Sequence, residues 1–306
     1  MQLNTVSMIG MGALGILFGH QFSSHLPQQQ FHFIANAERM ERYHAQPVLC
    51  NGEPCRFAFR EPGTAEAPAD LVVVAVKATA LESAIADMAG EIGPKTVIVS
   101  LLNGISSEQV LEAHWPGQVI YTVAIGMDAT RVGCELRYHQ AGYWQIGEKD
   151  GSSTERLAAL AALLQRCEIQ YEVCSDILAQ QWRKLMINVG INQSCAVYDV
   201  PYAGVKKPGP ARDTMVAAMH EVVQLAALCG ISLPQDAAEQ WLPAIDTFAD
   251  DGMPSMRQDI LAGRRTEVAL FSGTIRALAQ EHGMPTPVND RLYARIREIE
   301  AEKCRP

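Results

Sequence analysis

Short apolar runs alternate with amphipathic stretches through the first half of the chain. Residues 4–9 form an apolar run that stops at a glycine, and residues 13–24 carry apolar side chains at helical spacing. A second apolar run, residues 31–35, follows a polar turn, so the pattern predicts a strand, a helix and a strand. Residues 71–76 are an almost uninterrupted run of Leu, Val and Ala, which is typical of a strand buried on both faces of a parallel sheet.

The same alternation continues to about residue 173. Asn51 and Gly52 form a strong turn signal, so residues 48–59 are expected to be a small hairpin. Further helices are predicted over residues 80–92 and 155–167, and further strands over 96–101, 118–125, 135–138, 143–146 and 169–173. Alternation of this kind favours an α/β fold with a Rossmann-type doubly wound sheet.

From residue 176 onward only helical patterns remain. The predicted helices cover residues 177–195, 211–228, 236–249, 255–261, 266–281 and 289–302. Glycine and proline residues separate them, as expected for helix ends and starts. We therefore expect an α/β domain over residues 1–174, followed by an all-α helical domain over residues 175–306.

Composition narrows the class of protein. A chain of 306 residues is long enough for two hydrophobic cores, and a formal net charge of −9 offers no basic patch for nucleic acid. We see neither a secretory signal nor a membrane-length apolar window, and expect a soluble cytoplasmic protein. The eight cysteines are scattered without a C-x-x-C pair and the eight histidines show no ligand spacing, so reduced thiols and no metal site are expected.

A glycine-rich loop follows the first predicted strand. It consists of Gly10, Met11, Gly12, Ala13, Leu14 and Gly15, which is a G-x-G-x-x-G pattern. Gly10 permits a tight turn, Gly12 lets a pyrophosphate approach the backbone, and Gly15 lets the helix pack against the sheet. The bare pattern is weak, but its place between a strand and a helix favours a bound dinucleotide over a ligand-free glycine turn.

The residue that closes the second strand usually selects between the two nicotinamide cofactors. An acidic side chain there repels a 2′-phosphate, whereas a basic one attracts it. Here the strand closes with Ala35 and Asn36, and the nearest acid, Glu38, is followed by Arg39. We therefore expect NADPH, with Arg39 as the candidate phosphate contact and NADH left open.

Two polar residues stand where other predicted strands end. Lys77 ends the run over residues 71–76, and Asn103 precedes Gly104 after the strand over residues 96–101. Taken singly, each could be an ordinary solvated or turn residue. Together, beside a dinucleotide loop at the carboxyl ends of the strands, they favour a ligand.

One predicted helix carries polar residues among apolar neighbours. Lys184, Asn188 and Asn192 recur at steps of four, which aligns them along one face. Unpaired buried polar groups are unfavourable, so this stripe needs partners. A substrate is one such partner, and hydrogen bonds to other helices are the alternative.

These motifs, taken in order, resemble the ketopantoate reductase family. They are the glycine loop, Val76-Lys77-Ala78, Leu102-Asn103-Gly104, Trp182-Arg183-Lys184-Leu185 with Asn188 and Asn192, and Ser255-Met256-x-Gln258-Asp259 followed by Thr266-Glu267. The similarity extends from Gly10 to Glu267, and the motifs of the second half are more specific than the glycine loop.

The resemblance implies NADPH-dependent reduction of 2-dehydropantoate, a 2-keto acid, to pantoate in pantothenate and coenzyme A biosynthesis. It also implies a helical domain like the C-terminal domain of 6-phosphogluconate dehydrogenase. Lys184 would be the general acid and Glu267 would orient it. Asn188, Asn192 and Ser255 would bind the substrate, and Lys77 and Asn103 would contact the cofactor. A small-molecule substrate, no nucleic acid, no membrane, and a monomer or homodimer complete the expectation.

Three segments depart from the family pattern. Asn36 stands where an arginine is common, Gln193-Ser194-Cys195 replaces proline and small residues after Asn192, and Gly252-Met253-Pro254 precedes Ser255. These departures leave open a reductase of another branched 2-keto acid. A non-catalytic NADPH sensor is a second alternative, and a flavin-linked oxidoreductase ranks last.

Overall fold

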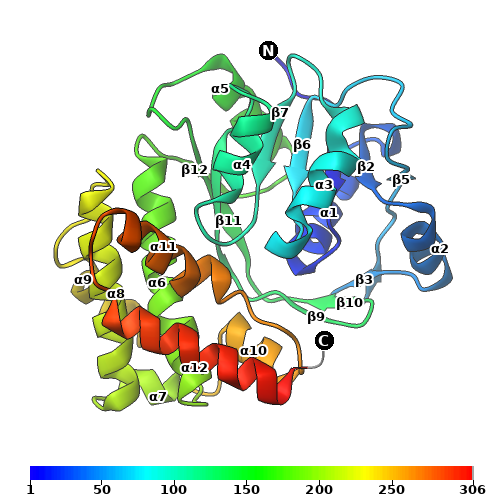
Figure 1. Cartoon of the computed structure of the whole chain (residues 1–306). Helices are drawn as coiled ribbons and strands as arrows, with labels where there is room; N and C mark the ends of the chain where they lie inside the picture. The colour runs from blue at the N-terminus through cyan, green and yellow to red at the C-terminus, as the bar shows by residue number, and fades with distance from the viewer. Residues whose placement is uncertain (305–306) are drawn as a thin grey trace. The chain divides into compact units, whose positions relative to one another are not determined.

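The chain divides into two compact units, which Figure 1 shows within one computed structural model. The structure describes residues 1–304. The first unit comprises Met1–Leu102 and Ser106–Ile177, and the second comprises Asn103–Ile105 and the described residues from Leu178 onward. The sequence placed the division between residues 174 and 175, whereas the first unit ends at Ile177.

A five-stranded parallel sheet forms the centre of the first unit. Its order is β5-β2-β1-β6-β7, and the strands are β1 (Val6–Ile9), β2 (Phe31–Ile34), β5 (Phe59–Arg60), β6 (Leu71–Val74) and β7 (Val97–Ser100). Every residue of β1, β2, β6 and β7 is buried, which explains their unbroken apolar runs. The chain runs outward from β1 on one side and from β6 on the other, so the topological switch point lies between these two neighbours.

The remaining elements of this unit cover and extend that sheet. The helices are α1 (Ala13–His25), α2 (Ala37–Ala45), α3 (Leu81–Met88), α4 (Ser107–His114) and α5 (Glu155–Arg166), with short 3-10 turns at Gln28–Gln30, Ala78–Ala80 and Ala89–Glu91. Four short strands form a sheet in the order β4-β3-β10-β9, namely β3 (Leu49–Cys50), β4 (Glu53–Pro54), β9 (Thr130–Val132) and β10 (Glu135–Arg137). A third sheet joins β8 (Tyr121–Met127), β11 (Ala141–Gly147) and β12 (Tyr171–Val173).

The expected hairpin is confirmed at its turn and wrong at its far end. Asn51 and Gly52 have φ of 49° and 83°, the positive values that a tight two-residue hairpin requires. Phe59 belongs instead to β5, which pairs in parallel with β2, because Phe59 lies opposite Phe33 of the central sheet.

A buried carboxylate connects the central sheet of the first unit to the turn after α3. Glu91 is 3% exposed and accepts a hydrogen bond of 2.7 Å from the Ser7 hydroxyl of β1. His32 of β2 lies 3.3 Å from the same carboxylate, and Arg60 of β5 donates to both oxygens at 3.1 and 3.3 Å. Burial raises the pKa of Glu91, but the hydrogen bonds and positive charge of these partners outweigh it and leave the pKa lowered.

All the secondary-structure elements in the described part of the second unit are helices. Its helices are α6 (Ile177–Val197), α7 (Ala203–Lys206), α8 (Pro210–Leu228), α9 (Ala237–Ile245), α10 (Ser255–Leu261), α11 (Thr274–Glu281) and α12 (Pro287–Lys303). The prediction missed α7 and extended α9 to residue 249, where the structure has a turn. It also drew one helix over residues 266–281, but Ala269–Gly273 is a π-helix in which the Gly273 amide donates to the Val268 carbonyl at 3.0 Å.

The three residues after Leu102 pack with this helical unit. Ile105 is 5% exposed and belongs to the apolar core of the helices. Gly104 has φ of +93°, a backbone conformation that favours glycine, and a Cβ there would contact Leu270 at 3.6 Å. Residues Asn103–Ile105, between β7 and α4, therefore belong to the helical unit, and the chain from Ser106 to Ile177 belongs to the first unit again.

Candidate functional site

Two glycines of the loop after β1 are required by the backbone itself. Gly10 has φ of +101°, and a Cβ there would lie 2.6 Å from the backbone of Ala75, the residue after β6. A Cβ on Gly15 would overlap the carbonyl oxygen of Gly10. The loop therefore folds tightly against the end of β6, at the switch point of the sheet.

Gly12 differs because nothing in the fold requires it to be glycine. Its φ is −75°, it is exposed, and a Cβ would find its nearest neighbour, the Ala75 carbonyl oxygen, at 3.8 Å. It is also the N-cap residue of α1 and makes no side-chain capping bond. The missing side chain leaves the backbone amides at the start of α1 open to approach, as a dinucleotide diphosphate requires. The residues present thus fit the cofactor that the sequence predicts.

Two further residues of the predicted cofactor site, Lys77 and Arg39, follow strands of the same unit. Lys77 is exposed and comes directly after Ala75 and Val76, whose backbone lies against Gly10. Arg39 is exposed in the first turn of α2, and its backbone amide donates to the Asn36 side chain at 3.0 Å. Asn36 therefore caps α2. It also follows the second strand, where dinucleotide-binding folds that prefer NAD have an acidic side chain for the ribose hydroxyl.

Arg131 contacts this loop, and the sequence did not reveal it. It comes from β9, 120 residues away, and its Nη1 donates to the carbonyl oxygen of Met11. Its Nε donates to the Gly133 carbonyl at 2.9 Å, which fixes the guanidinium on the hairpin. No local motif marks Arg131, because only the pairing of β9 with β10 brings it to the glycine loop.

The polar stripe on α6 exists as predicted. Lys184 and Asn188 are half-buried, Asn192 is buried, and the Asn192 side-chain amide donates to the Asn188 oxygen at 3.3 Å. The intervening side chains Leu185 and Val189 belong to the apolar core of the second unit. An ammonium and two carboxamides on one helical face can bind a carboxylate, a hydroxyl and a carbonyl oxygen.

The structure joins two predicted residues that lie far apart in the sequence. The Asn103 side-chain amide donates to the Glu267 carboxylate at 2.9 Å across 164 positions. Glu267 lies two residues before the π-helix, which begins at Ala269. Ser255, the first residue of α10, is exposed.

The departure after Asn192 has a structural explanation. Gln193 is fully buried, and its side-chain oxygen accepts hydrogen bonds from the amide and hydroxyl of Ser272 in the π-helix. Its amide nitrogen donates to the Val189 carbonyl at 2.7 Å. Gln193 therefore connects the π-helix to α6 by hydrogen bonds, so the change from the family pattern serves packing.

Among the described residues 1–304, no helix combines the length and apolar character that crossing a bilayer requires.

A Rossmann-type sheet with a glycine loop, joined to a helical unit with a Lys/Asn stripe, defines a class of nicotinamide-dependent oxidoreductases. Residues 6–151 match the family described as "Ketopantoate reductase PanE/ApbA", and residues 176–300 match "Ketopantoate reductase PanE/ApbA C terminal". The chain belongs to the ketopantoate reductase family.

Individual relatives agree with this membership. A 2-dehydropantoate 2-reductase from Halobacterium salinarum is 30% identical over 233 residues, which is 76% of each chain. A crystal structure of a PanE/ApbA family ketopantoate reductase from Ralstonia eutropha has a TM-score of 0.85 at 24% identity, covering 98% of this chain and 99% of that one. D-mandelate dehydrogenase with NADH gives a TM-score of 0.87 at 21% identity, with coverage of 98% and 99%, and so shows the shared fold.

Proposed function

We propose that this protein reduces 2-dehydropantoate to pantoate with NADPH. The observation that carries the proposal is the stripe of Lys184, Asn188 and Asn192 on α6, in a chain of the ketopantoate reductase family. A 2-keto acid presents a carboxylate and a ketone, which an ammonium and neighbouring carboxamides can bind together.

The glycine loop is proposed to hold the cofactor. The open backbone at Gly12 and the start of α1 would receive the diphosphate, with the Arg131 guanidinium beside the loop as a balancing charge. Arg39 would contact the 2′-phosphate, because no acidic side chain stands at the end of β2. Lys77 would contact the cofactor from the end of β6. The bound nicotinamide supplies the hydride.

The helical unit is proposed to supply proton transfer and substrate orientation. Lys184 would give a proton from Nζ to the ketone oxygen and stabilise the charge that develops there. Asn188, Asn192 and Ser255 would hold the substrate carboxylate and hydroxyl. Glu267 would orient Lys184, and its hydrogen bond from Asn103 would fix the carboxylate in place.

The test is a steady-state assay of NADPH oxidation with 2-dehydropantoate, run in parallel with NADH. We expect turnover that is faster with NADPH and that falls strongly in Lys184→Ala. Lys207→Ala, which removes an exposed lysine of the same unit, is the matched control and should keep the wild-type rate. Cofactor binding without turnover on any keto acid would refute the reductase and favour an NADPH sensor.

A different 2-keto acid is the second candidate. D-mandelate dehydrogenase shares the fold, and the segment before Ser255 is apolar here, with Pro254 buried and Met253 half-buried. A panel of aliphatic, branched and aromatic 2-keto acids separates the two, because kcat/KM reports differential transition-state binding. A preference of about tenfold or more for another acid would replace 2-dehydropantoate as the substrate.

We also place the protein in the cytoplasm. All eight cysteines are free thiols, which fits a reducing compartment.

A further inference from the structure

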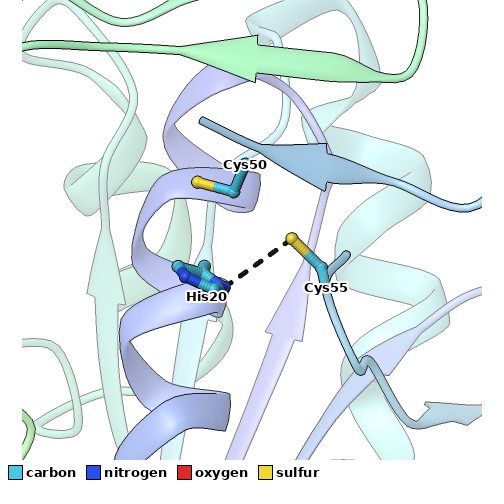
Figure 2. A group of neighbouring side chains, drawn as sticks. All are labelled: His20, Cys50 and Cys55. Carbon is cyan, nitrogen blue, oxygen red and sulfur yellow. Dashed lines mark hydrogen bonds between the residues drawn. The ribbon is translucent and has the colours of Figure 1, made fainter. Parts of the chain in front are cut away.

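Three side chains with soft or borderline metal-ligand atoms meet in the first unit. They are His20 from α1, Cys50 from β3 and Cys55 from the segment after β4, and Figure 2 shows them between the helix and the hairpin. Their ligand atoms all lie within 4.8 Å of one another. The Cys55 sulfur lies 3.7 Å from Nδ1 of the His20 imidazole.

The hairpin explains why the two cysteines share a face. Cys50 lies opposite Glu53, and the Cys55 amide donates to the Val48 carbonyl at 2.9 Å, so Cys55 lies opposite Val48. Side chains alternate between the two faces of a strand, and Val48, Cys50, Glu53 and Cys55 therefore point to one side. That side meets α1, because Cys50 is 2% exposed and packs in the same core as the helix.

We propose that His20, Cys50 and Cys55 bind one Zn²⁺ ion. Zinc takes thiolate and imidazole ligands at about 2.3 and 2.0 Å in tetrahedral geometry, which separates a sulfur from a nitrogen ligand by roughly 3.5 Å. The observed separation of 3.7 Å between Cys55 Sγ and His20 Nδ1 needs only a small adjustment. Binding would release the two thiol protons to solvent, since the thiolate is the ligand.

A disulfide between Cys50 and Cys55 fits the hairpin less well. The two residues are diagonal neighbours on the ladder, and such pairs have Cα atoms about 7–8 Å apart. A disulfide requires a Cα separation of about 4.4–6.8 Å, whereas a bridging ion spans a longer gap. His20 would also have no part in a disulfide, although its ring faces Cys55.

The fourth zinc ligand would be water or the Glu53 carboxylate. Glu53 lies opposite Cys50 on the same face of the hairpin and is exposed at its tip. Two thiolates, one imidazole and one oxygen form a ligand set of borderline softness, which suits Zn²⁺ better than Mg²⁺ or Ca²⁺. The ion would tie the hairpin to α1, the helix that begins at the glycine loop.

The sequence did not predict this site. His20 and Cys50 are thirty positions apart, and Cys50 and Cys55 lack C-x-x-C spacing. Only the turn at Asn51 and Gly52, together with packing on α1, brings the three residues together.

The test uses the full-length protein, stripped of metal under reducing conditions. Zn²⁺ is titrated in competition with a chromophoric chelator, and Co²⁺ is titrated separately to read thiolate charge-transfer and tetrahedral d–d absorption. We expect one equivalent of Zn²⁺ in the wild type. We expect a loss of affinity of at least about tenfold in each of Cys50→Ser, Cys55→Ser and His20→Gln.

Matched controls come from the same elements. Cys134→Ser removes a thiol beside the same small sheet and His25→Gln removes a histidine of α1, and both should bind Zn²⁺ as the wild type does. Cys55 and His20 are only half-buried, so their variants test the site even if Cys50→Ser fails to fold. Wild-type binding no tighter than in the Cys55→Ser variant would overturn the proposal. So would a Co²⁺ spectrum without thiolate bands.

Discussion

Replacement of Glu91 by glutamine should destabilise the first unit by about 2–3 kcal/mol at pH 7. The side chain keeps its shape, but its hydrogen bonds from Ser7, His32 and Arg60 lose the negative charge of their acceptor. Hydrogen bonds to charged groups contribute roughly 1.5–3 kcal/mol each, against about 0.5–1.5 for neutral ones. The Arg60 contribution is discounted because its side chain is 33% exposed.

The difference in stability between the wild type and Glu91→Gln should depend on pH in a defined direction. The folded-state pKa of Glu91 is lowered from its ordinary value of 4.5. Its stabilising effect is therefore fully present above pH 4.5 and is lost as the pH falls through the folded-state value. The wild type and Glu91→Gln should converge in stability on the acid side of that value.

Urea titrations at pH 7 and at a series of acidic pH values below 4.5 measure this convergence. Hydrogen exchange of the peptides that cover β1 and β2 shows where stability is lost. A loss of 2–3 kcal/mol in stability corresponds to about a 30-fold to 150-fold loss of protection from exchange at pH 7. Glu66→Gln removes an exposed carboxylate and is the control. Equal stability of the wild type and Glu91→Gln at pH 7, or a gap that widens with acid, would contradict this account of the cluster.

Three further predictions concern the proposed site. Gly12→Ala should fold normally, because its Cβ meets no protein atom closer than 3.8 Å, but it should weaken NADPH binding at least about tenfold, whereas Gly15→Ala should also unfold the loop. Thermal melts beside binding titrations separate the two variants. Normal NADPH affinity in folded Gly12→Ala would count against the diphosphate assignment. Lys184→Ala should lower kcat by about 10²–10⁴-fold with the fold intact, measured against Lys207→Ala, and wild-type kcat would exclude Lys184 as the acid. Arg131→Ala should raise the Kd for NADPH by about tenfold through lost charge beside the diphosphate, and an unchanged Kd at low salt would remove Arg131 from the cofactor site.

The sequence predicted the features that depend on local pattern. Strands β1, β2, β6 and β7 were visible because every residue in them is buried, and α10 occupies Ser255–Leu261 as its apolar spacing indicated. The Lys184, Asn188 and Asn192 stripe followed from helical periodicity alone. Roles for these residues still rest on the proposal.

What the sequence could not predict depends on long-range pairing. Arg131 reaches Met11 only through the β9–β10 hairpin, and the His20, Cys50 and Cys55 cluster needs both a turn and a helix to form. The π-helix at Ala269–Gly273 lies in a segment that reads as ordinary α-helix in the sequence, and its Ser272 donates to the buried Gln193 of another helix. Such features depend on contacts between side chains far apart in the sequence, which the hydrophobic periodicity of a segment does not reveal.

The packing of Asn103–Ile105 with the helical unit has a consequence for folding while the chain is being synthesised. These three residues leave the ribosome early, but Glu267, the hydrogen-bond partner of Asn103, follows 164 positions later. At about 5–20 residues per second, the nascent chain waits on the order of ten seconds before that partner is made. During this interval the apolar side chain of Ile105 lacks its final core, so the connection between β7 and α4 stays exposed until the helical unit is made.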